Sequence, residues 1–150
     1  MVCSIKFSSP FFFLEKSYDL NVTGTTISDN DGRGIAAEKL RSAIHIDDTS
    51  VSNNRHVAGV HILGGVPDVN VTGSRIAFNQ GDGINITVTG GNRNISRSSI
   101  SSNRGFGFAV WLNDSLNTEY VPFNQSTIVE YSEIFKNRDI GILVSFKISR

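Results

Sequence analysis

Residues 20–35 read LNVTGTTISDNDGRGI, and residues 69–84, VNVTGSRIAFNQGDGI, repeat nine of these sixteen positions. Three weaker copies begin at Ile44, Arg93 and Thr127, and they read IHIDDTSVSNNRHVAGV, RNISRSSISSNRGFGF and TIVEYSEIFKNRDIGI. A fixed period of roughly twenty to fifty residues is the signature of a repeat architecture. The chain is therefore organised as five copies of one unit.

Aligning the copies gives columns that each hold one kind of residue. Three columns are apolar: Val22, Ile46, Val71, Ile95 and Val129; Ile27, Val51, Ile76, Ile100 and Ile134; and Ile35, Val60, Ile84, Phe108 and Ile142. A fourth column is asparagine in every copy, at Asn30, Asn54, Asn79, Asn103 and Asn137, with spacings of 24, 25, 24 and 34 residues. A fifth is glycine in every copy, at Gly34, Gly59, Gly83, Gly107 and Gly141.

Apolar and polar residues alternate within each copy, which is the two-residue period of a half-buried strand. Three short strands and three turns fit one period, and coils stacked ~4.8 Å apart pair each strand in parallel with its equivalents. The sequence therefore predicts an all-β fold, a right-handed parallel β-helix of about five coils. We expect the glycines to occupy turns with unusual backbone angles. The asparagines, which tolerate the left-handed conformation, are predicted to form an internal ladder.

Length and charge set limits on function. The 150 residues carry fourteen basic and fourteen acidic side chains, so no basic patch predicts a nucleic-acid partner. The lone Cys3 excludes an internal disulfide framework and a cysteine-based zinc site, and no motif predicts another metal or a cofactor. The repeats occupy residues 20–144, between a non-repeat segment at 1–19 and a tail at 145–150.

The first sixteen residues do not fit the repeat. Their apolar core, residues 10–14, is too short to cross a bilayer, and the segment lacks the basic start and cleavage site of a secretory signal. We therefore expect no direct membrane insertion. Two interpretations stay open: sequence outside the authentic coding region, or a cap over the first coil's open strand edges.

After Trp111 the period lengthens by about ten residues, which predicts a long loop at 112–125. Loops on rigid scaffolds often carry binding sites. Trp111, Tyr120 and Phe123 are the candidates for a partner-binding aromatic patch. The alternative is that these residues cover neighbouring coils.

The N-glycosylation acceptor Asn-x-Ser/Thr occurs six times, at Asn21, Asn70, Asn85, Asn94, Asn113 and Asn124. Asn21, Asn70 and Asn94 share one outward column, where glycans on adjacent coils would crowd one another. We expect the loop sites, Asn113 and Asn124, to be used.

A search for catalytic groups gives one weak cluster, His45 and Asp47 on one outward face, with His61 on a later strand of the same coil. Acid–base hydrolysis needs groups that converge from several coils, and the flanking positions Asn21 and Asn70 are neutral. We therefore predict that the chain is not an enzyme. The alternative is a carbohydrate-active enzyme, or a carbohydrate-binding module, that uses His45, Asp47 and His61.

The quoted repeats, with NISRSSISSNRGFGFAVW and STIVEYSEIFKNRDIGILV, resemble the pectate-lyase-like right-handed β-helix family. More narrowly, they resemble the β-helix blocks of a large insect single-pass membrane protein that organises tricellular contacts and septate junctions. This resemblance implies a segment on the extracellular side of the plasma membrane at cell junctions, and the sequons predict that it is glycosylated. Its partners would be other cell-surface or junction proteins and flanking β-helix coils of the same protein.

Overall fold

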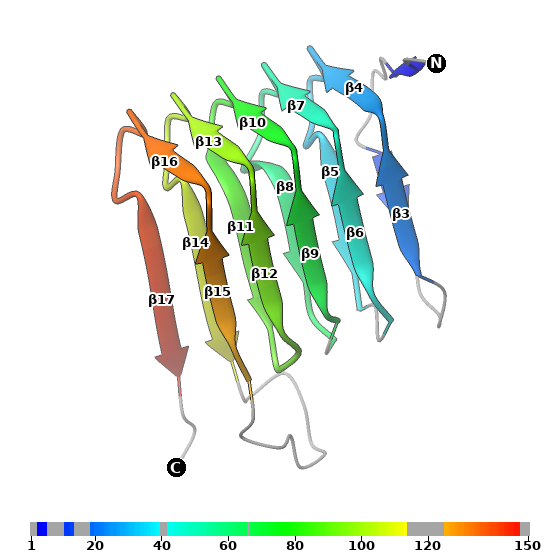
Figure 1. The fold of residues 1–150 in the computed structure, drawn as a ribbon. Coiled ribbons are helices and arrows are strands. Elements are labelled where there is room, and N and C mark those ends of the chain that lie inside the picture. The colour runs from blue at the N-terminus through cyan, green and yellow to red at the C-terminus, as the bar shows by residue number, and fades with distance from the viewer. Residues whose placement is uncertain are drawn as a thin grey trace.

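In a computed structural model, the protein is a parallel β-helix made of three sheets (Figure 1). The structure describes residues 3–5, 11–13, 19–39, 42–65, 67–113 and 125–147. Each sheet takes one strand from each complete coil, and the strand pairs of the described residues are parallel. The predicted all-β fold is confirmed.

The strands are named here by the sheet to which they belong. Sheet A contains β1 (Cys3–Ile5), β4 (Thr25–Ser28), β7 (Ser50–Ser52), β10 (Arg75–Ala77), β13 (Ser99–Ser101) and β16 (Glu133–Phe135). Sheet B contains β2 (Phe11–Phe13), β5 (Ile35–Glu38), β8 (Ala58–Leu63), β11 (Asp82–Val88), β14 (Phe108–Asn113) and β17 (Ile142–Lys147). Sheet C contains β3 (Leu20–Thr23), β6 (Ile44–Asp47), β9 (Val69–Thr72), β12 (Arg93–Ser96) and β15 (Thr127–Glu130).

The coil count exceeds the predicted five by a partial coil at the N-terminal end. The backbone of β1 pairs with β4 and that of β2 pairs with β5, so Ile5 aligns with Ile27 and Phe11 with Ile35. The repeat was not visible there because residues 6–10 contain neither asparagine nor glycine. At the other end β17 pairs with β14 as far as Lys147, so the predicted tail begins later than residue 145.

The apolar columns form a thin core between the sheets. The registers align Ile35, Val60 and Ile84 in sheet B, and Ile27, Val51 and Ile76 in sheet A. These side chains are all fully or almost fully buried. At ~25 cal/mol per Å² of buried apolar surface, such columns supply the main driving force for stacking.

The asparagine column forms a hydrogen-bonded ladder inside the turn between sheets A and B. Each side-chain Nδ2 donates to Oδ1 of the next coil's asparagine, at 2.7 Å from Asn30, 2.9 Å from Asn54 and 3.0 Å from both Asn79 and Asn103. The backbone N–H of each of these residues donates to the same Oδ1. Each interior asparagine therefore satisfies buried backbone and side-chain groups at once.

The roles expected for asparagine and glycine in the turns need correction. Positive φ occurs at the residue before each ladder asparagine, for example 59° at Asp29 and 58° at Phe78, and not at the asparagine itself. The glycine column is not left-handed either. A Cβ on Gly83 would lie 2.5 Å from Gly107 O and 2.6 Å from Ile100 Cγ2, so close approach of the next coil selects glycine.

A second internal ladder, made of hydroxyls, lies in the turn between sheets C and A. Its members sit at one position of successive coils: Thr49, Ser74, Ser98 and Ser132. The hydroxyl oxygens of Ser74, Ser98 and Ser132 each accept the backbone N–H of the preceding member at 3.1 Å. Each hydroxyl donates to the carbonyl two residues earlier at 2.8–2.9 Å. Sequence reasoning missed this column because serine and threonine are common in turns, although its spacing matches that of the asparagines.

Candidate functional site

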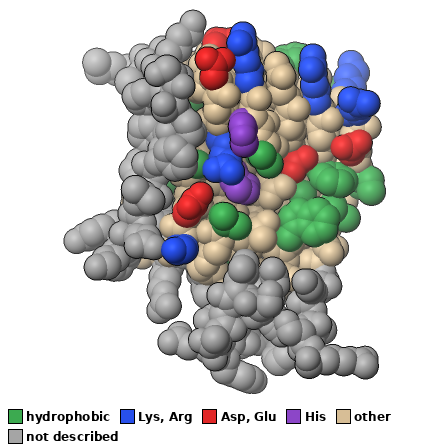
Figure 2. Space-filling model, turned by 180° about the vertical axis from the view of Figure 1, so that it is seen from behind, with side chains coloured by type: hydrophobic (Ala, Val, Ile, Leu, Met, Phe, Trp, Pro, Cys, Tyr) green, Lys and Arg blue, Asp and Glu red, His purple; other side chains and the backbone are tan. Residues whose placement is uncertain are grey.

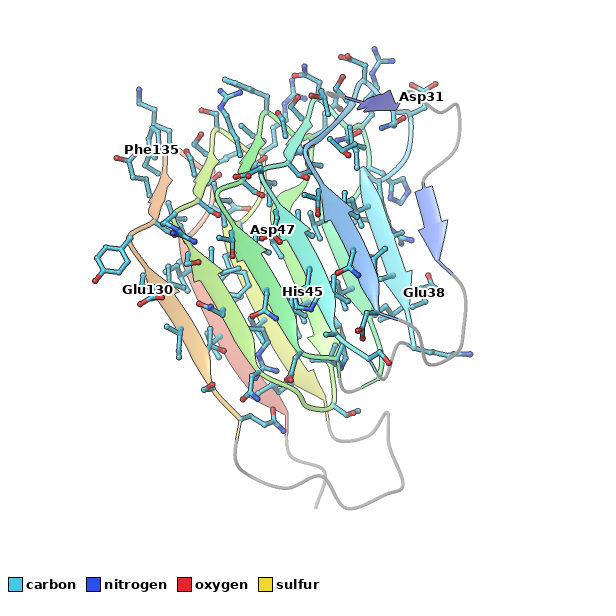
Figure 3. The ribbon with its side chains drawn as sticks, turned by 45° about the vertical axis from the view of Figure 1, so that its right-hand side comes forward. Asp31, Glu38, His45, Asp47, Glu130 and Phe135 are labelled. Atoms are coloured by element: carbon cyan, nitrogen blue, oxygen red, sulfur yellow. The ribbon has the colours of Figure 1, made fainter. Side chains whose placement is uncertain are left out.

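The outer face of sheet C carries His45 and Asp47, and strand alternation turns both of them outward (Figure 3). In the strand register, His45 lies between Asn21 and Asn70, while Asp47 lies between Thr23 and Thr72. These neighbours are uncharged, as expected from the repeat. The face therefore offers one imidazole and one carboxylate on β6, and a second carboxylate, Glu130, three strands away on β15.

His61 lies on a different sheet, so the structure does not bring the three candidate residues together. It belongs to β8 in sheet B, where its register neighbours are Ala36 and Asn85. Its side chain is only 8% exposed, and its Nδ1 has no hydrogen-bond partner. Burial, followed by the positive charges of Arg33 and His56, lowers the pKa of His61 to about 4. The imidazole is therefore uncharged at neutral pH.

Charged side chains surround His61 on the outer face of sheet B. Figure 2 views the molecule from behind, where histidine side chains lie beside basic and acidic ones. Arg33 Nη1 lies 3.8 Å from Glu38 Oε1, and Arg33 Nε is buried without a partner. Asn85 Nδ2 donates to Asp82 Oδ2 at 2.6 Å. Asp82 Oδ1 also accepts the backbone N–H of Phe106 on the next coil at 2.8 Å, so both carboxylates are engaged with neighbouring groups.

The described residues contain neither a metal-binding cluster nor a membrane-spanning helix. No group of three or more His, Cys, Asp or Glu side chains there is arranged to hold a metal ion. Nor does that part of the chain contain a helix long and apolar enough to cross a membrane.

Four of the six sequon asparagines have described side chains, and they differ in their surroundings. Asn21 is exposed, whereas Asn70, Asn85 and Asn94 are partly buried. Asn94 Oδ1 is buried without a partner, and Asn85 is held by Asp82. The side chain of Asn113 and the whole of Asn124 lie outside the described residues, so their use stays a prediction.

The aromatic patch predicted for the long loop is only partly visible. Trp111 does not belong to the loop. It lies in β14, where its backbone pairs with Thr87 and Ser145. Its indole is 36% exposed and meets the Phe106 ring edge-on, with centroids 6.4 Å apart. Tyr120 and Phe123 lie outside the described residues.

Comparison with known proteins gives the family. Residues 3–121 match the family described as "Right handed beta helix region". This chain belongs to the right-handed β-helix family. The match begins inside the segment that shows no repeat in its sequence, in agreement with the strands β1 and β2.

The chain is also 52% identical over 129 residues to "Protein bark beetle" of Drosophila melanogaster. The alignment covers 84% of this chain but only 4% of that protein. No solved structure matches the chain. The β-helix assignment and the relationship to this insect protein are therefore shown. Because this chain matches so small a part of that protein, the match does not assign the activity of the whole protein to this chain.

Arg93 is a buried residue whose role sequence reasoning missed. It occupies the inner column of sheet C, in register with Val69 and Thr127, and is only 1% exposed. Its guanidinium donates to Gly90 O at 3.2 Å and Gln125 Oε1 at 3.5 Å. Burial lowers its pKa, and the charge of Asp68 partly opposes that shift. The sequence did contain a signal for this burial, because Arg93 aligns with the apolar residues Leu20, Ile44 and Val69.

The described outer faces support binding or spacing better than acid–base catalysis. Hydrolysis with two carboxyl groups needs them to face one another across a substrate, about 5–10 Å apart. Asp47 has threonines as its register neighbours, while Glu38 and Asp82 lie on another sheet. Long stacked columns with hydrogen-bonded ladders instead provide a stiff support for surface groups.

Proposed function

We propose that this chain is a non-enzymatic, extracellular β-helix segment of a larger membrane-anchored protein that assembles epithelial cell junctions. The observation that carries the proposal is the 52% identity to protein bark beetle over 84% of the chain. The family resemblance noted in the sequence points to tricellular and septate junctions. The partners would be other cell-surface or junction proteins and flanking β-helix coils.

The architecture fits a spacer that holds surfaces at a set distance. Five complete coils at ~4.8 Å each make a stack roughly 24 Å long. Two internal ladders tie neighbouring coils together through buried side chains such as Asn79 and Ser74, which favours one fixed register. A rod of this kind presents its outer residues without needing to change shape.

The last coil favours further coils as neighbours. Ile142 and Val144 belong to the inner columns, yet they are 44% and 39% exposed because β17 ends its sheet. The glycine column also continues at Gly141, where nothing in the described part of the chain requires it. A Cβ there would have ordinary contacts, with the nearest atom 3.6 Å away. Both features suit a coil stacked on β15, β16 and β17.

The test is localisation in an epithelium. A tagged parent protein that lacks residues 20–144 should fail to concentrate at tricellular contacts while still reaching the cell surface. A variant that lacks only residues 113–124 tests whether the long loop binds the partner at the cell contact. The matched control, His45→Ala with Asp47→Ala, keeps the fold and should localise normally. Normal localisation without residues 20–144 would refute the proposal.

The enzymatic alternative has its own assay. The chain should release no new ends from polygalacturonate, alginate or hyaluronan, with or without calcium, because His45 and Asp47 come from one strand and their register neighbours on the adjacent strands are uncharged. Turnover that disappears in His45→Ala or Asp47→Ala would replace the proposed function with a carbohydrate-active one.

A further inference from the structure

We propose that Asn21 carries an N-linked glycan and that Asn70, Asn85 and Asn94 do not. This inference rests on the proposed extracellular location, since the modification occurs only on chains that enter the secretory pathway. All four asparagines begin the acceptor pattern Asn-x-Ser/Thr, so sequence alone does not rank them. Their surroundings in the fold do.

Asn21 is the accessible acceptor. It lies on β3, the last strand of sheet C in the described part of the chain, where its register neighbour is His45. Both Asn21 and the hydroxyl-bearing Thr23 are exposed. A glycan on Asn21 Nδ2 would project from the outer face of β3 into solvent, because the alternation of β3 turns Asn21 and Thr23 outward.

The three other acceptors are obstructed in different ways. Asn85 Nδ2, the atom that would carry the sugar, donates to Asp82 Oδ2 at 2.6 Å. Asn94 Oδ1 is buried, and Ser96 of its sequon is buried as well. Asn70 lies between His45 and Asn94 on adjacent strands ~4.8 Å apart, which leaves little width for a branched sugar.

The chemistry is a glycosyl transfer from a lipid-linked oligosaccharide diphosphate. Asn21 Nδ2 forms a bond to the anomeric carbon, the bond from that carbon to the diphosphate oxygen breaks, and Nδ2 loses one proton. The lipid diphosphate leaves with the bonding electrons. Because transfer precedes folding, the fold acts on the product: a glycan at Asn21 is compatible with the β-helix, whereas glycans at the other three positions oppose it.

The experiment directs the full 150-residue chain into the secretory pathway of cultured animal cells with a heterologous signal sequence. Peptide N-glycosidase in ¹⁸O-water then converts each glycosylated asparagine to labelled aspartate, which mass spectrometry locates. We expect label on most molecules at Asn21 and on at most a tenth as many at Asn70, Asn85 and Asn94. Thr23→Ala should abolish the label at Asn21, Thr23→Ser should keep it, and Asn70→Gln should change nothing.

Secreted, folded chain without label at Asn21 would overturn the inference, and so would equal label at all four positions. Because the signal sequence is supplied, neither result depends on where the natural protein resides. The proposed junctional location is tested separately in the epithelium, so the two failures are distinguishable.

Discussion

Replacing Asn79 with alanine tests the internal ladder where it is best enclosed. Asn79 is completely buried, and the substitution removes four hydrogen bonds. Its Oδ1 accepts from the backbone N and from Nδ2 of Asn54 at 3.1 and 2.9 Å. Its Nδ2 donates to Asn103 Oδ1 and Val51 O at 3.0 and 3.2 Å.

The magnitude follows from the groups left without partners. Two buried donors of Asn54 lose their acceptor, and each unsatisfied buried group costs about 1–3 kcal/mol. Asn103 Oδ1 keeps the backbone N–H of residue 79, so it adds little. We therefore expect Asn79→Ala to lower the free energy of unfolding by about 3–5 kcal/mol.

The assay is urea denaturation followed by far-UV circular dichroism. Asn137→Ala is the matched control at the half-buried end of the ladder. It likewise strips acceptors from the backbone and side-chain nitrogens of Asn103, but there water can replace them, so about 1 kcal/mol is expected. Asn92→Ala removes hydrogen bonds that are exposed and should cost at most ~1 kcal/mol.

An isosteric variant separates hydrogen bonding from volume. In Asn79→Asp a carboxylate would face the oxygens of Asn103 and Val51, so burial and repulsion raise the folded-state pKa of the new carboxyl. Stability at pH 7 should be low and should rise as pH falls through that pKa, because the protonated acid donates again. Equal stabilities of Asn79→Ala and Asn92→Ala, or no pH response of Asn79→Asp, would refute the ladder argument.

Three other predictions use the same denaturation assay. Gly83→Ala should lower the free energy of unfolding by about 2–4 kcal/mol, because its Cβ would meet backbone and side-chain atoms of the next coil. Gly141→Ala should change it by no more than about 1 kcal/mol. Equal effects of the two substitutions would contradict the close-approach explanation. His61 has a folded-state pKa of about 4 against an ordinary 6.5, so the folded state binds fewer protons between these values. Stability should therefore fall as pH drops through that window, by at most about 3 kcal/mol, and His61→Gln should flatten the profile. Arg93→Leu should leave stability unchanged or raise it, because leucine completes an apolar column, while Arg93→Ala should be about 2 kcal/mol less stable than Arg93→Leu. An Arg93→Leu variant clearly less stable than the natural chain would show that the hydrogen bonds of Arg93 outweigh the cost of its burial.

The fold was predictable because its determinants recur at a fixed spacing. A column of Ile27, Val51 and Ile76 specifies one inward position, and the ladder asparagines fix the register of successive coils. The partial first coil was not predictable in this way. The pairing of Phe11 with Ile35 depends on apolar residues alone, and the spacing between the strands of that coil differs from that of the later copies.

The candidate site was less predictable than the fold for a geometric reason. Alternation along a strand tells whether His45 or His61 points outward, but it does not give the angle between their sheets. Only the closed coil shows that the two imidazoles belong to different faces. The burial of His61 and of Arg93 likewise depends on residues far away in sequence, which no local pattern contains.

The repetition that makes the fold predictable from the sequence also restricts which functional sites its surface can form. Each outward column takes one residue from each coil, so a catalytic centre requires several coils to depart from the repeat at neighbouring positions. In the column of Asn21, Asn70 and Asn94, His45 replaces asparagine on one coil and Ile128 replaces it on the last coil, and these two coils are not adjacent. The neighbours of His45 retain the sequon, and on β3 the retained sequon is exposed. A sequence that varies one coil at a time is thus suited to decorating a rod, with sugars or with contact residues, more than to assembling an active site.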